Sequence, residues 1–145
     1  GVAGLDSTGV VPYAQLPFAQ ADIKHRHVLG WALSDEETPL TTGIKIKDRI
    51  PFNCTIVDAL LSLVEPSDGT GAGSVVVDVK INGGSIFNSG QEIYVGNRST
   101  SSKSGGGGNF TLSNSTLNEN DIIEIEIIEP GQTASGAKLK LVVEE

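Results

Sequence analysis

The sequence is poor in cysteine, methionine, aromatic residues and positive charge. Its 145 residues include one cysteine, no methionine and 5% aromatic residues, and 10 Lys and Arg stand against 18 Asp and Glu. A single cysteine excludes an internal disulfide framework and a multi-cysteine zinc site. The net charge of -8 argues against binding to a phosphate backbone, so no nucleic acid partner is expected. The scarcity of aromatic side chains weakens the case for a platform that stacks bases or sugars.

Long apolar runs are also missing, so no membrane-spanning segment and no membrane partner are expected. A chain of 145 residues suits one domain, which hides roughly 70% of its unfolded surface on folding. A core of useful size is therefore expected without disulfides.

Residues 43–145 carry the two-residue alternation that is typical of β-strands. Apolar side chains alternate with polar or charged ones, so each strand would turn one face to a core and the other to solvent. The alternating apolar residues are Ile44 and Ile46; Val57, Ala59, Leu61 and Leu63; Val75, Val77, Val79 and Ile81; Ile123, Ile125 and Ile127; Leu139, Leu141 and Val143. Many short antiparallel strands in one domain predict an all-β fold, a β-sandwich or jelly-roll-like domain or a small barrel.

Three local stretches add detail to this prediction. Thr55–Glu65 also fits a helix face, but its β-branched start and its strand surroundings favour a strand. Asn82-Gly83 supplies the positive φ angles of a tight turn, so Val75–Ile81 and Ser85–Phe87 are expected to pair antiparallel. Ser99–Gly108 is rich in Ser and Gly and predicts a flexible loop, since it lacks the Gly-Lys-Ser/Thr ending of a phosphate-binding loop.

Residues 1–42 show no sustained periodicity, and we assign them to an extended N-terminal arm and a connector that precede the β-sandwich domain of residues 43–145. A short apolar segment interrupted by prolines cannot form a regular helix, a central strand or a core of its own. It should lie on its own sandwich, on a neighbouring subunit or on a larger assembly, since apolar surface needs a partner. The residues expected to make this contact are Leu5, Val10, Val11, Pro12, Leu16, Pro17 and Phe18.

Several segments resemble bacteriophage proteins. The segment from Leu5 to Pro17, LDSTGVVPYAQLP, resembles an "LDxxGxVPxxQLP" segment of phage fibre and other virion-surface proteins. The segment from Val77 to Phe87, VDVKINGGSIF, is similar to a hairpin of a β-sandwich module in tail and virion proteins. The stretches 120–125 and 136–141 match the closing strands of that module.

The resemblance implies a non-enzymatic virion structural protein, located on the virion surface and assembled as a homotrimer without a cofactor. An arm followed by one sandwich suits a capsid decoration (cement) or head-fibre protein, whose partners are other virion proteins such as the major capsid protein or tail proteins. The alternative is a tail-fibre domain that binds a host receptor or surface glycan, for example through residues 99–108. That loop carries no family motif, so its role stays open.

His25 and His27 are the only histidines, and residues two apart point to the same side of an extended segment. One chain offers too few donors for a closed metal site, whereas three copies around a threefold axis would supply six imidazoles. This His-x-His pattern resembles the iron-binding element of some phage fibre and spike tips. The alternative is a solvated or salt-bridged basic turn.

Patterns for catalysis or calcium binding are weak. No Gly-x-Ser-x-Gly elbow lies between a strand and a helix. Glu124 and Glu126 would lie on one strand face about 7 Å apart, a separation found in inverting glycosidases, but the solvated face of an amphipathic strand explains the spacing more simply. Asn118–Asp121 gathers ligand oxygens without the EF-hand spacing, which favours an ordinary turn.

Two single residues complete the set of candidates. Cys54 follows a turn at a strand start and is expected to be a small buried residue rather than a reactive thiol. Trp31 lies in an apolar stretch and is expected to plug the edge of the sandwich or to anchor a subunit interface.

Overall fold

A computed structural model describes residues 24–145 except 70, 72 and 105–109. These residues form an all-β fold with no helix, and hence none that is long and apolar enough to cross a membrane. The strands are β1 (Arg26–Ala32), β2 (Gly43–Arg49), β3 (Cys54–Ser62), β4 (Val75–Ile81), β5 (Gly84–Ser85), β6 (Ile93–Val95), β7 (Thr116–Leu117), β8 (Ile122–Pro130) and β9 (Lys138–Glu144).

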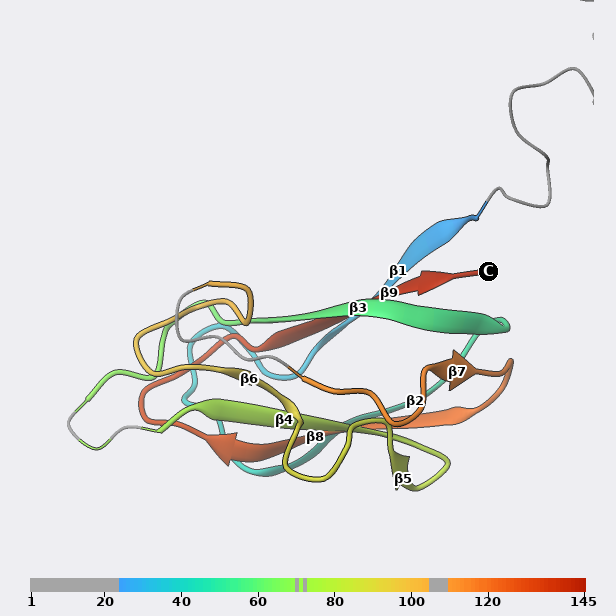
Figure 1. The fold of residues 1–145 in the computed structure, drawn as a ribbon. Coiled ribbons are helices and arrows are strands. Elements are labelled where there is room, and N and C mark those ends of the chain that lie inside the picture. The colour runs from blue at the N-terminus through green and yellow to red at the C-terminus, as the bar shows by residue number, and fades with distance from the viewer. Residues whose placement is uncertain (1–23, 70, 72, 105–109) are drawn as a thin grey trace, which may run out of the picture.

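Two antiparallel sheets pack face to face, which confirms the predicted β-sandwich (Figure 1). One sheet has the order β1-β9-β3-β7, and the other has the order β2-β8-β4-β5, with β6 also paired to β4. Aliphatic side chains from both sheets meet between them, and Val77, Ile125 and Leu141 are fully buried there. Each such side chain contributes about 1.5–3 kcal/mol when it leaves water, so this shared layer is the main source of stability.

Three β-bulges shift the expected alternation. A bulge places two residues opposite one and changes the face to which neighbouring side chains point. The register of β2 slips between Ile44 and Ile46, and Ile44 is 52% exposed while Ile46 packs on the core. Val57 is the extra residue of β3, so it faces solvent and Ile56 is buried instead. A third bulge exposes Ile128 on β8. The prediction that Ile44 and Val57 face the core was therefore wrong.

Of the two other local predictions, the strand is confirmed, and the hairpin is confirmed at its turn, although its second strand is Gly84–Ser85 and not Ser85–Phe87. The ambiguous run 55–65 forms most of strand β3 rather than a helix. Asn82 and Gly83 connect β4 to β5 with φ angles of 50° and 90°, and Lys80 pairs with Ser85 across the hairpin. These two positive φ angles are those of the tight turn that suits twisted antiparallel strands.

Strand β1 belongs to the sandwich, although the sequence placed its residues in the arm and connector. It pairs with β9 from Arg26, opposite Glu144, to Ala32, opposite Lys138. The domain boundary expected at residue 43 thus differs from the structure, in which only residues 33–42 connect β1 to β2. Along β1 apolar residues and glycine occupy both faces, so no apolar–polar alternation marked it as a strand.

The two ends of the sandwich differ (Figure 1). The described chain enters β1 at the end where Glu145 lies, and the Glu145 N–H donates to the carbonyl of His25 at 2.9 Å. The loops that follow β1, β3 and β8 gather at the opposite end, which we call the loop end.

Candidate functional site

One long side of the sandwich exposes an edge of each sheet. β1 ends one sheet and β2 ends the other, and within the described part of residues 24–145 neither has a second partner strand. On the opposite side, β7 lies along the start of β3, while β5 and β6 lie along β4. An uncovered edge presents unpaired main-chain N–H and C=O groups, which can template pairing with another chain. We call the side formed by β1 and β2 the open side.

Residues 99–104 complete the cover on the opposite side. The Ser102 hydroxyl accepts a hydrogen bond from the Leu61 N–H at 3.0 Å, and the Ser102 N–H donates to the Leu61 carbonyl at 2.8 Å. The Lys103 ammonium donates to the Asp58 carboxylate at 2.5 Å, which lowers the pKa of Asp58. This half of the predicted flexible loop is therefore fixed on β3 and protects its edge.

A shallow groove of about 400 Å³ runs along the open side. This edge groove is lined by Val28, Leu29, Gly30, Trp31, Asp48, Arg49 and Pro51. Val28 is 59% exposed, and Leu29 and Trp31 are half-buried against the core. A second hollow of about 200 Å³ adjoins Gly30 and Trp31 and is also lined by Lys138 and Lys140 of β9. The groove therefore combines apolar side chains with the charged side chains of Asp48 and Arg49.

Trp31 closes the gap between the two sheets at this side. Its indole N–H donates to the Asp48 carboxylate at 3.1 Å. That bond, together with the bond from the Arg49 N–H, lowers the pKa of Asp48. The structure thus places Trp31 at the edge of the sandwich, as one of the two sequence-based alternatives predicted. A subunit interface at Trp31 remains a prediction.

The histidines lie where the chain enters β1. The His27 ring contacts the Glu145 carboxylate, with Nε2 and Oε2 2.6 Å apart, and packs edge-on against Phe52 with ring centroids 5.2 Å apart. His25 is exposed. Among the residues that the structure describes, no group of three or more His, Cys, Asp or Glu side chains could hold a metal ion. A site shared by three copies of His25 and His27 stays a prediction.

Glu124 and Glu126 lie on the outer face of β8 within a cross-strand charge pattern. Glu124 stands opposite Lys47 on one side and Lys80 on the other. The Lys80 ammonium donates to Glu126 at 3.0 Å, and this bond raises the pKa of Lys80. Opposite charges on neighbouring strands stabilise a sheet, so the pattern has a structural explanation.

The two remaining candidates are the turn at 118–121 and Cys54, and the contacts of each within the fold explain them. Both Asp121 carboxylate oxygens accept hydrogen bonds, one from the Asn82 amide at 3.0 Å and one from the Asn118 N–H at 2.9 Å. These bonds close the turn that leads into β8, as the sequence favoured. Cys54 is buried, which confirms its prediction, and burial raises the pKa of its thiol.

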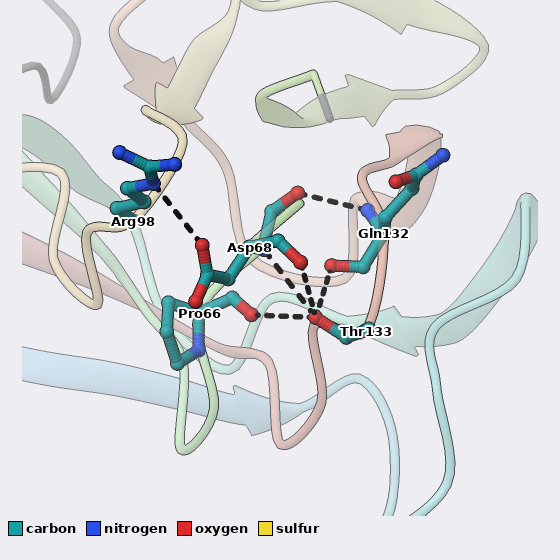
Figure 2. Close-up of polar contacts among 6 residues, drawn as sticks. Pro66, Asp68, Arg98, Gln132 and Thr133 are labelled. Atoms are coloured by element: carbon teal, nitrogen blue, oxygen red, sulfur yellow. Dashed lines mark hydrogen bonds and ion pairs between the residues drawn. The ribbon is translucent and has the colours of Figure 1, made fainter. Parts of the chain in front are cut away.

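The loop end holds a polar cluster that the sequence did not reveal (Figure 2). The Thr133 hydroxyl lies 3.2 Å from the Pro66 carbonyl and 3.3 Å from the Asp68 N–H, and Arg98 donates to the Asp68 carboxylate at 3.1 Å. Thr133 and Arg98 have φ angles of 64° and 65°, which is rare for residues other than glycine. The cluster fastens the loops after β3, β6 and β8 to one another. No sequence motif signals it, because its partners are distant in the chain.

The residues expected to form the assembly arm lie outside the described residues; they are Leu5, Val10, Val11, Pro12, Leu16, Pro17 and Phe18. Comparisons of the chain with protein-family models, with curated proteins and with solved structures found no match.

Proposed function

We propose that this chain is a non-enzymatic structural protein of a bacteriophage virion, of the capsid-decoration or head-fibre type. It assembles as a homotrimer on the virion surface through its N-terminal arm and its sandwich, and it contacts other virion proteins such as the major capsid protein. The resemblance of residues 5–17 and 77–87 to phage proteins supports this proposal. The β-sandwich is the fold that the resemblance implies.

One observation carries the assembly part of the proposal. The apolar arm precedes β1 in the sequence, and among the described residues β1 is an edge strand with β9 as its one partner, while the opposite side of the sandwich is covered by β5, β6, β7 and residues 99–104. An apolar segment and an open sheet edge in one chain can supply the two partners of an intersubunit contact. Each subunit that binds a neighbour in this way stabilises the neighbour's folded state by mass action.

The test is a chain that lacks residues 1–20. The sandwich starts at Arg26, so the truncated chain should keep the circular dichroism spectrum of the full chain but should no longer be incorporated into purified particles. Asp68→Asn at the loop end is the matched control, because it leaves the arm intact and should be incorporated normally. Full incorporation of the truncated chain would refute the role of the arm.

A second candidate function is a tail-fibre domain that binds a host receptor or surface glycan. The observation that favours it is the loop end, where loops from three parts of the chain are fastened together at the end away from the start of β1 (Figures 1 and 2). Binding sites are commonly built from loops held on a rigid scaffold. This function predicts saturable binding of the purified protein to host cells, and Arg98→Ala should weaken it. Absence of adsorption would eliminate it.

A further inference from the structure

The main chain of β1 has a row of groups directed toward the open side. The ladder between β1 and β9 is flanked by a bond from the Glu145 N–H to the His25 carbonyl and a bond from the Leu33 N–H to the Ala137 carbonyl. Hydrogen-bonded pairs alternate along an antiparallel ladder. The odd-numbered residues of β1 therefore bond to β9, and even-numbered ones such as Val28 turn their N–H and C=O groups to the outer edge. A further strand can bond there.

The side chains around this edge specify what kind of strand would fit. Leu29 and Trp31 lie on the core side of β1 and are only half-buried. Pro51 adds exposed apolar surface at the rim of the edge groove. An added strand with apolar side chains on its core side would cover Leu29 and Trp31 and extend the core. A polar strand would leave this apolar surface without a partner.

Residues 13–18, Tyr-Ala-Gln-Leu-Pro-Phe, have the required pattern. In an extended conformation Ala14, Leu16 and Phe18 share one face. With that face on the core, the orientation of the added strand decides which main-chain groups meet β1. In a parallel alignment the core-facing residues bond to β1, and Pro17, which has no N–H, faces away from it. In an antiparallel alignment Pro17 would be one of the bonding residues and would lose a bond. The pattern selects the parallel alignment.

A parallel alignment requires a second chain. Parallel strands of one chain need a crossover of a dozen or more residues between them. Only residues 19–25, seven in number, separate Phe18 from the first residue of β1. The arm therefore cannot lie parallel to the β1 that follows it, but it can reach the β1 of a neighbour.

We infer that the open edge of β1 and the edge groove bind residues 13–18 of a second copy of this chain as a parallel strand. This inference rests on the proposed arm-mediated assembly and names its receiving surface. Each copy donates one arm and receives another. In the proposed homotrimer this contact is heterologous, and it closes as a three-membered ring. Leu16 and Phe18 of one copy cover Leu29 and Trp31 of the next.

The experiment uses the full chain and its only tryptophan, Trp31, as a reporter. Oligomer mass by analytical ultracentrifugation and Trp31 emission are followed over a dilution series. Both should change at the same protein concentration, with a red shift as the ring dissociates. The double variant Leu16→Asp/Phe18→Asp should raise the dissociation constant at least about 100-fold, because two apolar contacts are lost and two charges would be buried. The matched control Gln15→Asp adds charge to the outward face and should change neither readout.

Two results would overturn the inference. A monomer whose emission is independent of concentration but red-shifts in the double variant would show that the arm covers its own groove. If the double variant has the same oligomer mass and the same Trp31 emission as the parent chain, the arm binds elsewhere. Incorporation of the double variant into particles is scored separately. If it fails to incorporate although either result holds, the arm function stands and only the proposed receiving surface is wrong.

Discussion

Trp31 on β1 donates its indole N–H to the carboxylate of Asp48 on β2, at 3.1 Å. The two strands end different sheets, so this bond joins the layers at the side where no described strand covers them. The same indole forms part of the edge groove. Its surroundings can therefore be followed by fluorescence without any added label.

The Trp31–Asp48 bond predicts an acid-sensitive signal. The pKa of Asp48 in the folded protein lies below its ordinary value of 3.8 because it accepts bonds from Trp31 and Arg49. The bonds to the ionised Asp48 carboxylate therefore contribute fully to the stability of the fold above about pH 4. This contribution is lost as the pH falls through the lowered pKa. At fixed protein concentration, Trp31 emission should stay constant from neutral pH to about pH 4 and change below it. Asp48→Ala should abolish this transition, and an unchanged transition in that variant would contradict the assignment.

The bulge in β3 predicts opposite sensitivities of two adjacent residues. Ile56 is 4% exposed, whereas Val57 is 38% exposed. Ile56→Thr should lower the free energy of unfolding by about 2–4 kcal/mol, because it removes buried apolar surface and buries a hydroxyl. Val57→Thr should change it by no more than about 0.5 kcal/mol. Urea unfolding followed by circular dichroism measures both, and the reverse order of effects would mean that the register is wrong.

The β4–β5 hairpin predicts a difference between two adjacent glycines. Gly83 has a φ of 90°, whereas Gly84 has no such angle and a Cβ there would meet only the Ile81 carbonyl at 3.8 Å. Gly83→Ala should destabilise the fold by about 1 kcal/mol, since alanine resists a positive φ. Gly84→Ala is the control and should stay within about 0.5 kcal/mol of the parent. Thermal unfolding of the two variants compares them, and equal effects would refute the turn assignment.

The cover on β3 predicts a role for one serine of the Ser/Gly-rich loop. Ser102 is 8% exposed and its hydroxyl accepts from the buried Leu61 N–H. Ser102→Ala should cost about 1–3 kcal/mol, because it leaves a buried donor without an acceptor. Thr100→Ala alters an exposed side chain of the same segment and should be nearly neutral. Hydrogen exchange at the Leu61 amide should accelerate in the first variant only. Unchanged exchange there would mean that the loop does not protect this edge.

The sequence predicted those parts of the fold that depend on local pattern. Alternation located β4, β8 and β9, and Asn82-Gly83 located the hairpin, because both signals lie within a few neighbouring residues. The sequence did not predict the bulges at Ile44 and Val57, because an extra residue is defined only by its pairing with the partner strand. The residues around the bulges are apolar, so the sequence did not show that their side chains change from one face of the sheet to the other.

The candidate site was only partly accessible from sequence for the same reason. Trp31 was expected at the sandwich edge or at a subunit interface because of its size and apolar neighbours, but its bond to Asp48 joins two sheets and depends on the sandwich geometry. The loop-end cluster around Thr133 likewise brings together residues from three loops. Contacts of this kind arise from tertiary packing and produce no periodic pattern in the amino-acid sequence.

The separation of the loop end from the start of β1 also makes this molecule a spacer. A seven-residue strand such as β9 spans about 23 Å. A foreign epitope grafted into the loop after β3 would therefore be carried about a strand length from the start of β1. If the inferred ring forms, such a graft would place evenly spaced copies of the epitope on it and leave the inferred contacts between subunits untouched.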